Sequence, residues 1–186
     1  MECSNSPIGF EIPQPPNLIV YLYDAIGAEA DYAEFVHALR YAPEGQEITI
    51  HINSPGGNLH TCLSIVNAMI ASDAIITTVV DGDASSAAAI IWLAGMNRLI
   101  ASKHVCVMLH GASCGFGSSK ISDITSSTKA TDKIVESLLD DLTIDFLTDE
   151  ERADIRKGVD IYITGAEIIE RWKDTQDEVS IDDPKA

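Results

Sequence analysis

Apolar and polar positions follow strand-like and helix-like spacings in turn through the first hundred residues. Two segments, Leu18–Tyr23 and Ile48–Ile52, have the composition of short strands, and the β-branched run Ala74–Val80 is typical of a buried strand. Between them lie an amphipathic segment, Ala30–Tyr41, and a stretch in which leucine, valine and isoleucine recur every three or four residues from Leu59. Because strands separated by helices usually pair in parallel, this pattern predicts an α/β fold with a largely parallel core sheet.

The pattern continues with shorter elements and one long helix. We expect the third strand to stop at Asp81-Gly82-Asp83 and a tightly packed helix to follow over Ala84–Ala94, with short strands at Leu99–Ala101 and Val105–Leu109. A long helix is predicted from about Lys120 to Phe146. Its expected inward face carries Ile121, Ile124, Ile134, Leu138 and Leu142.

Two capping boxes predict the last helices. Thr148 with Glu151 opens a helix that should end at Lys157-Gly158, and Thr164 with Glu167 opens one that should end near Lys173. Four of the seven prolines lie in residues 1–17, which therefore read as an extended N-terminal arm. We expect one compact domain over residues 18–175 and an acidic tail over 176–186.

Composition narrows the classes of function. The chain has 186 residues, is 46% apolar and carries a formal charge of −17, which provides no footprint for nucleic acid or an anionic membrane surface. The N-terminus lacks the pattern of a secretory signal, and the longest apolar run is too short to span a membrane. The four cysteines are interpreted as reduced thiols, and a cytoplasmic location is expected.

Two junctions between a strand and a helix are candidates for a catalytic site. At Ser54-Pro55-Gly56-Gly57 and again at Gly82-Asp83-Ala84-Ser85-Ser86-Ala87, a strand ends where a helix begins. Backbone amides at such a position have no partner within the helix, and glycine permits a close approach. Two amides that converge on one point, near Gly57 and Ala87, would form an oxyanion hole. Each motif alone is also an ordinary turn or N-cap.

A nucleophilic serine at Ser86 would need a base and an orienting acid. Among the five histidines, His110 is the best candidate, because it ends an apolar strand and enters a glycine-rich loop. Asp160 is the best candidate acid, because it lies between a helix stop at Gly158 and the apolar stretch Ile161–Ile163.

These residues resemble the proteolytic subunit of the Clp protease, a self-compartmentalised serine peptidase, over roughly residues 18–175. The similar segments are Ile48–Gly57, Gly82–Ala87, Val107–His110 and Asp160–Thr164, in that order. The resemblance implies Ser86 as nucleophile, His110 as general base and acid, and Asp160 as the residue that orients the imidazole. It also implies that the amides of Gly57 and Ala87 bind the oxyanion, without a metal or cofactor.

The same resemblance implies a spiral of ββα units, the architecture shared by Clp proteases and crotonases, with a protruding handle helix at about 120–146. It further implies a homo-oligomer of stacked, heptameric rings that enclose a chamber for unfolded polypeptide, and an AAA+ unfoldase ATPase as a partner. Three features depart from the family pattern: Gly111-Ala112-Ser113 follows the histidine instead of a glutamine–proline pair, Ala87 replaces a methionine, and the N-terminal arm is dissimilar.

Other functions stay open at the level of sequence. A crotonase-type acyl-CoA enzyme would use the paired amides, with Asp83 as the one candidate general acid. A catalytically silent ring or scaffold subunit would have the same fold without the activity. A serine–lysine dyad would need Lys103 or Lys120 as base, and a metal site would draw on His104, Cys106, His110 and Cys114.

Overall fold

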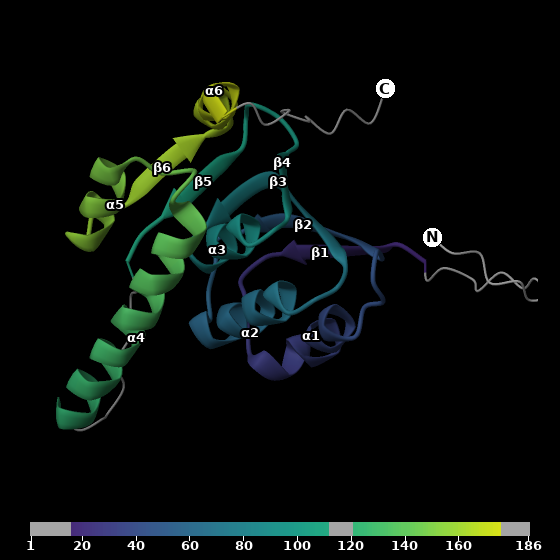
Figure 1. Cartoon of the computed structure of the whole chain (residues 1–186). Coiled ribbons are helices and arrows are strands. Elements are labelled where there is room, and N and C mark those ends of the chain that lie inside the picture. Colours follow the sequence, from purple (N-terminus) through teal and green to yellow (C-terminus); the bar gives the residue numbers. More distant parts are fainter. Residues whose placement is uncertain (1–15, 112–120, 176–186) are drawn as a thin grey trace, which may run out of the picture.

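A mixed sheet with helices on its faces and a projecting long helix makes up the chain (Figure 1). The structure is a computed structural model that describes residues 16–111 and 121–175, except for the side chains of 121–128, 174 and 175. The strands are β1 Leu18–Tyr23, β2 Glu47–Ser54, β3 Ile75–Ser85, β4 Asn97–Ile100, β5 Cys106–Leu109 and β6 Ile161–Thr164. The helices are the 3₁₀ helix η1 Glu29–Tyr32, α1 Ala33–Arg40, α2 Leu59–Ile70, α3 Ala87–Leu93, α4 Ile121–Thr143, α5 Asp149–Arg156 and α6 Gly165–Thr175.

The predicted parallel core sheet is confirmed. Its strand order is β1-β2-β3-β5-β6, with β4 paired to β3. Every pairing from β1 to β5 is parallel, whereas β6 pairs antiparallel with β5. Helices α1 and α2 cover one face of the sheet, and α4 projects away from it (Figure 1).

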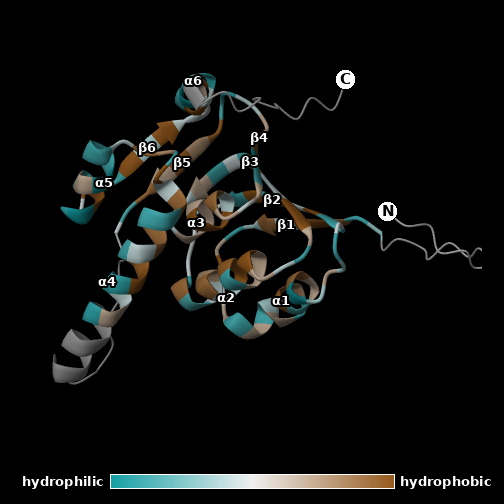
Figure 2. Cartoon of the chain, viewed as in Figure 1, coloured by the Kyte–Doolittle hydropathy of each residue, from teal (hydrophilic) through white to brown (hydrophobic). Residues whose placement is uncertain are grey.

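The core lies between that sheet face and the helices. Alternate residues of β2 are fully buried, as strand geometry requires. The isoleucines among them belong to the same core as α3, whose seven residues are all apolar and buried. Figure 2 shows this hydrophobic colouring concentrated on the strands, α2 and α3, with α5 mainly hydrophilic. The largest fully buried side chain is Trp92, which makes an edge contact with Phe146 at 5.2 Å between ring centroids.

One predicted strand end is wrong. β3 does not stop at Asp81 but continues to Ser85, because Asp83 to Ser85 pair in register with Cys106 to Met108 of β5. Gly82 does not form a turn. It allows the side chain of Asn53 to come close to the backbone of β3, since a Cβ at Gly82 would lie 2.7 Å from the side-chain oxygen of Asn53. The following helix consequently begins at Ala87 and not at Ala84.

The expected inward face of the long helix is also partly wrong. Ile134 is 49% exposed, whereas its neighbour Val135 and Leu139, one turn further on, are buried; the predicted Leu138 and Leu142 are partly buried. The apolar stripe therefore lies about one position further round the helix than the sequence pattern indicated. The side chains of Ile121 and Ile124 lie outside the described residues, and the helix ends at Thr143.

Both predicted capping boxes are confirmed. Thr148 accepts a hydrogen bond from the amide of Glu151, whose carboxylate accepts one from the amide of Thr148, and Thr164 and Glu167 repeat the arrangement. No helix within the described ranges is long and apolar enough to cross a membrane. Cys62 and Cys106 are free thiols, and the other two cysteines lie outside the described residues.

A half-buried ion pair joins α5 to α6. Arg171 donates to both carboxylate oxygens of Glu151, at 2.6 and 2.9 Å, and to the carbonyl of Phe146 at 3.0 Å. Its guanidinium also lies 5.5 Å from the centroid of the Phe146 ring. Hydrogen bonds from Arg171 are the main cause that lowers the pKa of Glu151 to about 2, from an ordinary 4.5.

This lowered pKa predicts an acid-sensitive contribution to stability. Because the pKa of Glu151 is lower in the folded chain, its contribution is present above pH 4.5 and is lost as the pH falls toward 2. We expect Glu151→Gln to reduce the free energy of unfolding at pH 7 by about 1–3 kcal/mol and to flatten its decline between pH 5 and 2. Denaturant unfolding at pH 7 and 3 measures both effects, with the exposed Glu150→Gln as control. Equal behaviour of the two variants would contradict the prediction.

Candidate active site

The side chains of Ser86 and His110 meet at the end of the sheet. Nε2 of His110 lies 2.7 Å from Oγ of Ser86, although the two residues are 24 positions apart in sequence. Ser86 follows the last residue of β3, and His110 follows the last residue of β5, two strands that pair directly. The carboxyl ends of neighbouring parallel strands therefore bring the predicted nucleophile and base into hydrogen-bonding contact.

The backbone of Ser86 has an uncommon conformation. Its φ of 57° and ψ of −122° are disfavoured for a residue with a side chain, at a cost of about 1–3 kcal/mol. Its amide donates to the carbonyl of Met108 at 2.8 Å, and its carbonyl accepts the hydrogen bond from Ile90 that opens α3. This sharp turn from strand to helix directs the hydroxyl out of the sheet toward His110.

The two strand–helix junctions lie in direct contact. A Cβ added to Gly56 would lie 2.5 Å from the carbonyl oxygen of Ser85, 2.8 Å from Cβ of Ser86 and 3.0 Å from the amide nitrogen of Ala87. Gly56 has a φ of 89°, which glycine alone adopts without strain. The sequence singled out Gly57 of this pair, and Gly56 is the residue that lets the junctions touch.

Two backbone amides at this contact have no hydrogen-bond partner among the residues that the structure describes. Gly57 forms a bridge with Ile26 that uses the amides of Ile26 and Asn58 and leaves the amide of Gly57 out. Ala87 is the first residue of α3, so its amide has no acceptor within the helix. Gly57, Ser86, Ala87 and His110 line one pocket of about 50 Å³.

A buried thiol that the sequence did not bring forward supports the second junction. Cys62 of α2 is fully buried and its Sγ donates to the carbonyl of Ala87 at 3.3 Å. Burial raises the pKa of Cys62 to about 12, so the thiol keeps the proton that it donates. An apolar cysteine position on the inner face of a helix gives no sequence signal for such a contact.

Asp160 lies across from His110 in the strand register, but the two side chains are not hydrogen-bonded. Leu109 of β5 pairs with Ile161 of β6 in the antiparallel register, which places the following residue, His110, across from Asp160. The side chain of Asp160 is exposed, and no hydrogen bond joins it to His110 in the part of the chain that the structure describes. The structure thus brings together Ser86 and His110 and leaves the third predicted residue at the neighbouring strand end.

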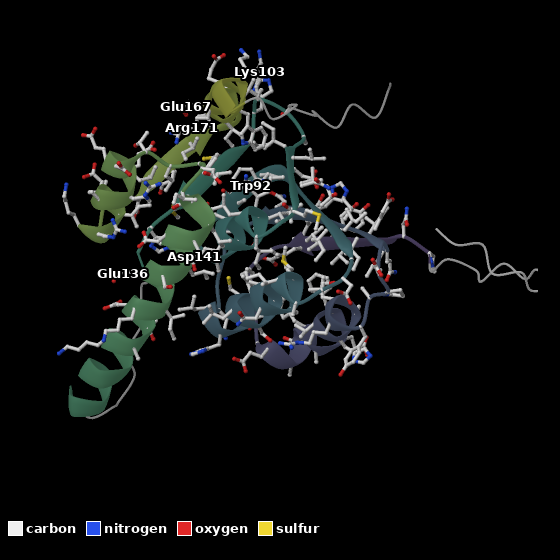
Figure 3. The ribbon with its side chains drawn as sticks, viewed as in Figure 1. Trp92, Lys103, Glu136, Asp141, Glu167 and Arg171 are labelled. Atoms are coloured by element: carbon white, nitrogen blue, oxygen red, sulfur yellow. The ribbon has the colours of Figure 1, made fainter. Side chains whose placement is uncertain are left out.

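The residues proposed for a crotonase-type acid, a lysine base or a metal site do not form such a site among the described residues. Asp83 accepts a hydrogen bond from Oγ of Ser85 at 2.7 Å and is absent from the pocket beside Ser86. Lys103 is exposed, and its backbone packs against Gly165 at the start of α6, beside which it is labelled in Figure 3. Lys120 and Cys114 lie outside the described residues. Within the described ranges, no three histidine, cysteine or acidic side chains form a group that could hold a metal.

The family model described as Clp protease matches residues 17–170, and the chain belongs to the Clp protease family. The predicted fold class, with its ββα units, is that of this family.

Curated relatives agree with this assignment. The chain is 32% identical over 116 residues to "ATP-dependent Clp protease proteolytic subunit 1" of Rhodococcus jostii, which covers 62% of this chain and 52% of that protein. It is 29% identical over 124 residues to "ATP-dependent Clp protease proteolytic subunit" of Bacteroides thetaiotaomicron, covering 66% of this chain and 56% of that protein. The chain therefore matches about half the length of these curated relatives.

The contact between the junctions predicts a large effect for one methyl group. Gly56→Ala should destabilise the chain by several kcal/mol, because its Cβ would overlap the backbone of Ser85. Gly45→Ala is a matched control, since Gly45 has a similar φ of 79° but nothing lies within 4 Å of its Cβ position. That variant should cost only about 1 kcal/mol of backbone strain. Denaturant unfolding measures both, and equal costs would contradict the close contact.

Proposed function

We propose that this chain is a serine endopeptidase in which Ser86 is the nucleophile and His110 the general base. The observation that carries the proposal is the 2.7 Å hydrogen bond between His110 Nε2 and Ser86 Oγ. It lies in a pocket bordered by the amides of Gly57 and Ala87, which have no partner in the described part of the chain. Neither a crotonase-type site nor a silent scaffold subunit requires a hydroxyl on a strained turn beside an imidazole. Membership of the Clp protease family points to the same reaction.

The acylation step follows from this geometry. Oγ of Ser86 attacks the carbonyl carbon of the scissile peptide bond, and its proton passes to Nε2 of neutral His110. The carbonyl oxygen becomes an oxyanion in a tetrahedral intermediate. When the intermediate collapses, the carbon–nitrogen bond breaks, and the protonated imidazole returns the proton to the leaving amine. The acyl group remains on Ser86.

The oxyanion is stabilised by the two free amides in this proposal. The N–H groups of Gly57 and Ala87 donate to it, and the positive end of the short helix α3 adds a small favourable field. Both amides are fixed by backbone packing before substrate binds, so no reorganisation is needed as charge develops. In the second half of the reaction, His110 takes a proton from a water molecule, which attacks the acyl-enzyme. His110 then returns the proton to Oγ of Ser86 as the carboxylic acid product leaves.

Asp160 completes the proposed triad. Its carboxylate would accept a hydrogen bond from Nδ1–H of His110, which fixes the tautomer with a free Nε2 and stabilises the imidazolium. The antiparallel register of β5 and β6 supports this role, because its continuation puts Asp160 opposite His110, and the contact would require an adjustment of the Asp160 side chain and its local backbone. We propose that substrate binding or assembly of the oligomer makes this adjustment.

We further propose that the chain acts within a homo-oligomer. Residues 18–175 would form the peptidase domain, with 1–17 as an N-terminal arm and 176–186 as an acidic tail. The projecting helix α4 supports a role as the handle that joins stacked, heptameric rings around a chamber for unfolded polypeptide. An AAA+ unfoldase ATPase is the proposed partner, and the cytoplasm the proposed location.

Covalent labelling tests the nucleophile directly. A fluorophosphonate probe should modify Ser86, located by mass mapping of the peptides, and labelling should be lost in Ser86→Ala and His110→Ala. The exposed His60→Ala is the matched histidine control and should label normally. Peptide hydrolysis should fall by on the order of 10⁶-fold in Ser86→Ala. Normal labelling of His110→Ala, or a modified residue other than Ser86, would contradict the proposal.

Replacement of Asp160 tests the third member of the triad. Asp160→Asn keeps the size of the side chain but favours the wrong imidazole tautomer, so kcat should fall by about 10⁴-fold. The control Asp145→Asn changes an exposed carboxylate of the same charge and should leave kcat within about twofold. A loss of less than tenfold in Asp160→Asn would assign the orienting role to another group.

A further inference from the structure

A second, larger pocket adjoins the proposed catalytic pocket. It has a volume of about 260 Å³, lies between α4 and α5, and shares Gly111 and Val135 with the pocket of Ser86 and His110. Gly111 directly follows the proposed base in sequence. A peptide whose scissile carbonyl lies at Ser86 would therefore have this pocket next to its binding site.

The floor of this larger pocket is apolar. Val135, Leu139 and Ile155 line it, and all three are at least 93% buried. Such a surface favours the methylene groups of a long side chain over a small polar one. The pocket of Ser86 and His110 is smaller, at about 50 Å³, so the larger pocket is the better candidate to hold a long side chain.

Both arginines that line the pocket among the described residues are already paired. Arg152 is 17% exposed at its side chain, pairs with Asp149 and donates to the carbonyl of Leu147 at 2.7 Å. Arg156 pairs with Asp140. Both guanidinium groups therefore already have a carboxylate partner within the protein.

Two carboxylates of the lining have no such partner. Asp132 and Glu136 are exposed, lie one turn apart on α4 and make no hydrogen bond or ion pair within the described part of the chain. They place two negative charges beside an apolar floor. The formal charge of −17 on the whole chain adds attraction for a basic peptide.

We propose that this pocket, through Asp132 and Glu136, selects a lysine or arginine side chain close to the scissile bond. The methylene stem would lie on Val135, Leu139 and Ile155, and the cation would face the two free carboxylates. This assignment of a substrate class rests on the proposed peptidase function. It makes Asp132 and Glu136 determinants of specificity, without a part in the bond-breaking steps.

Position-scanning peptide libraries test the preference. Cleavage should be enriched for lysine and arginine at one position near the scissile bond, with kcat/KM at least tenfold above the matched leucine peptide at low salt. The double variant Asp132→Asn, Glu136→Gln should reduce this ratio about tenfold, since each exposed carboxylate contributes about two- to fivefold. Higher salt should lower the ratio in the wild type but scarcely in the double variant.

A control and a second readout separate this inference from the proposed function. Asp141→Asn removes the same charge five residues from Glu136, a position about 140° around α4 and outside the pocket lining (Figure 3), and should keep the ratio unchanged.

If a fluorophosphonate labels Ser86 but lysine and leucine peptides are cleaved equally, the proposed specificity is overturned and the proposed peptidase function stands. If Ser86 is not labelled and no peptide is cleaved, both are overturned. An equal loss for both peptides in the double variant would also overturn the selectivity.

Discussion

The contact between Gly56 and the turn at Ser86 is the constraint on which the site depends. Ser86 adopts a backbone conformation that side chains disfavour, and this conformation persists only because its surroundings determine it. Gly56 fills the space behind the turn so closely that no Cβ fits, and the carbonyl of Met108 holds the Ser86 amide. The hydroxyl is thereby directed toward His110 and the helix amides toward the same pocket.

Strand pairing and helix packing hold the two junctions in this contact. The parallel pairing of β3 with β5 places Ser86 and His110 on adjacent strand ends, and the bridge between Ile26 and Gly57 fixes the other junction. The buried thiol of Cys62 on α2 donates a hydrogen bond to the first carbonyl of α3. The pair Glu151–Arg171 ties α5 to α6, on either side of the strand that begins after Asp160.

Local chemistry explains what the sequence could predict. The strand-like composition of Leu18–Tyr23 and Ile48–Ile52 predicted β1 and β2, and the hydroxyl–glutamate spacing predicted α5 and α6, because these signals act within a few residues. The end of β3 was wrong because its last residues are held as a strand by pairing with β5, a contact formed at long range. The buried side of α4 was misplaced for the same reason, since its packing partner decides which face is covered. Ser86, His110 and Gly57 were found from strand ends and glycines, but the role of Gly56 needed the three-dimensional contact.

The central claim is that the two junctions converge to hold one oxyanion beside Ser86. A crystal structure of the chain after reaction with a peptidyl phosphonate tests it most directly, because a phosphonyl oxygen occupies the place of the oxyanion. The account predicts a bond between phosphorus and Oγ of Ser86, with one phosphonyl oxygen about 2.7–3.1 Å from the amide nitrogens of both Gly57 and Ala87. An adduct whose oxygen contacts neither amide, or that forms on another residue, would contradict it.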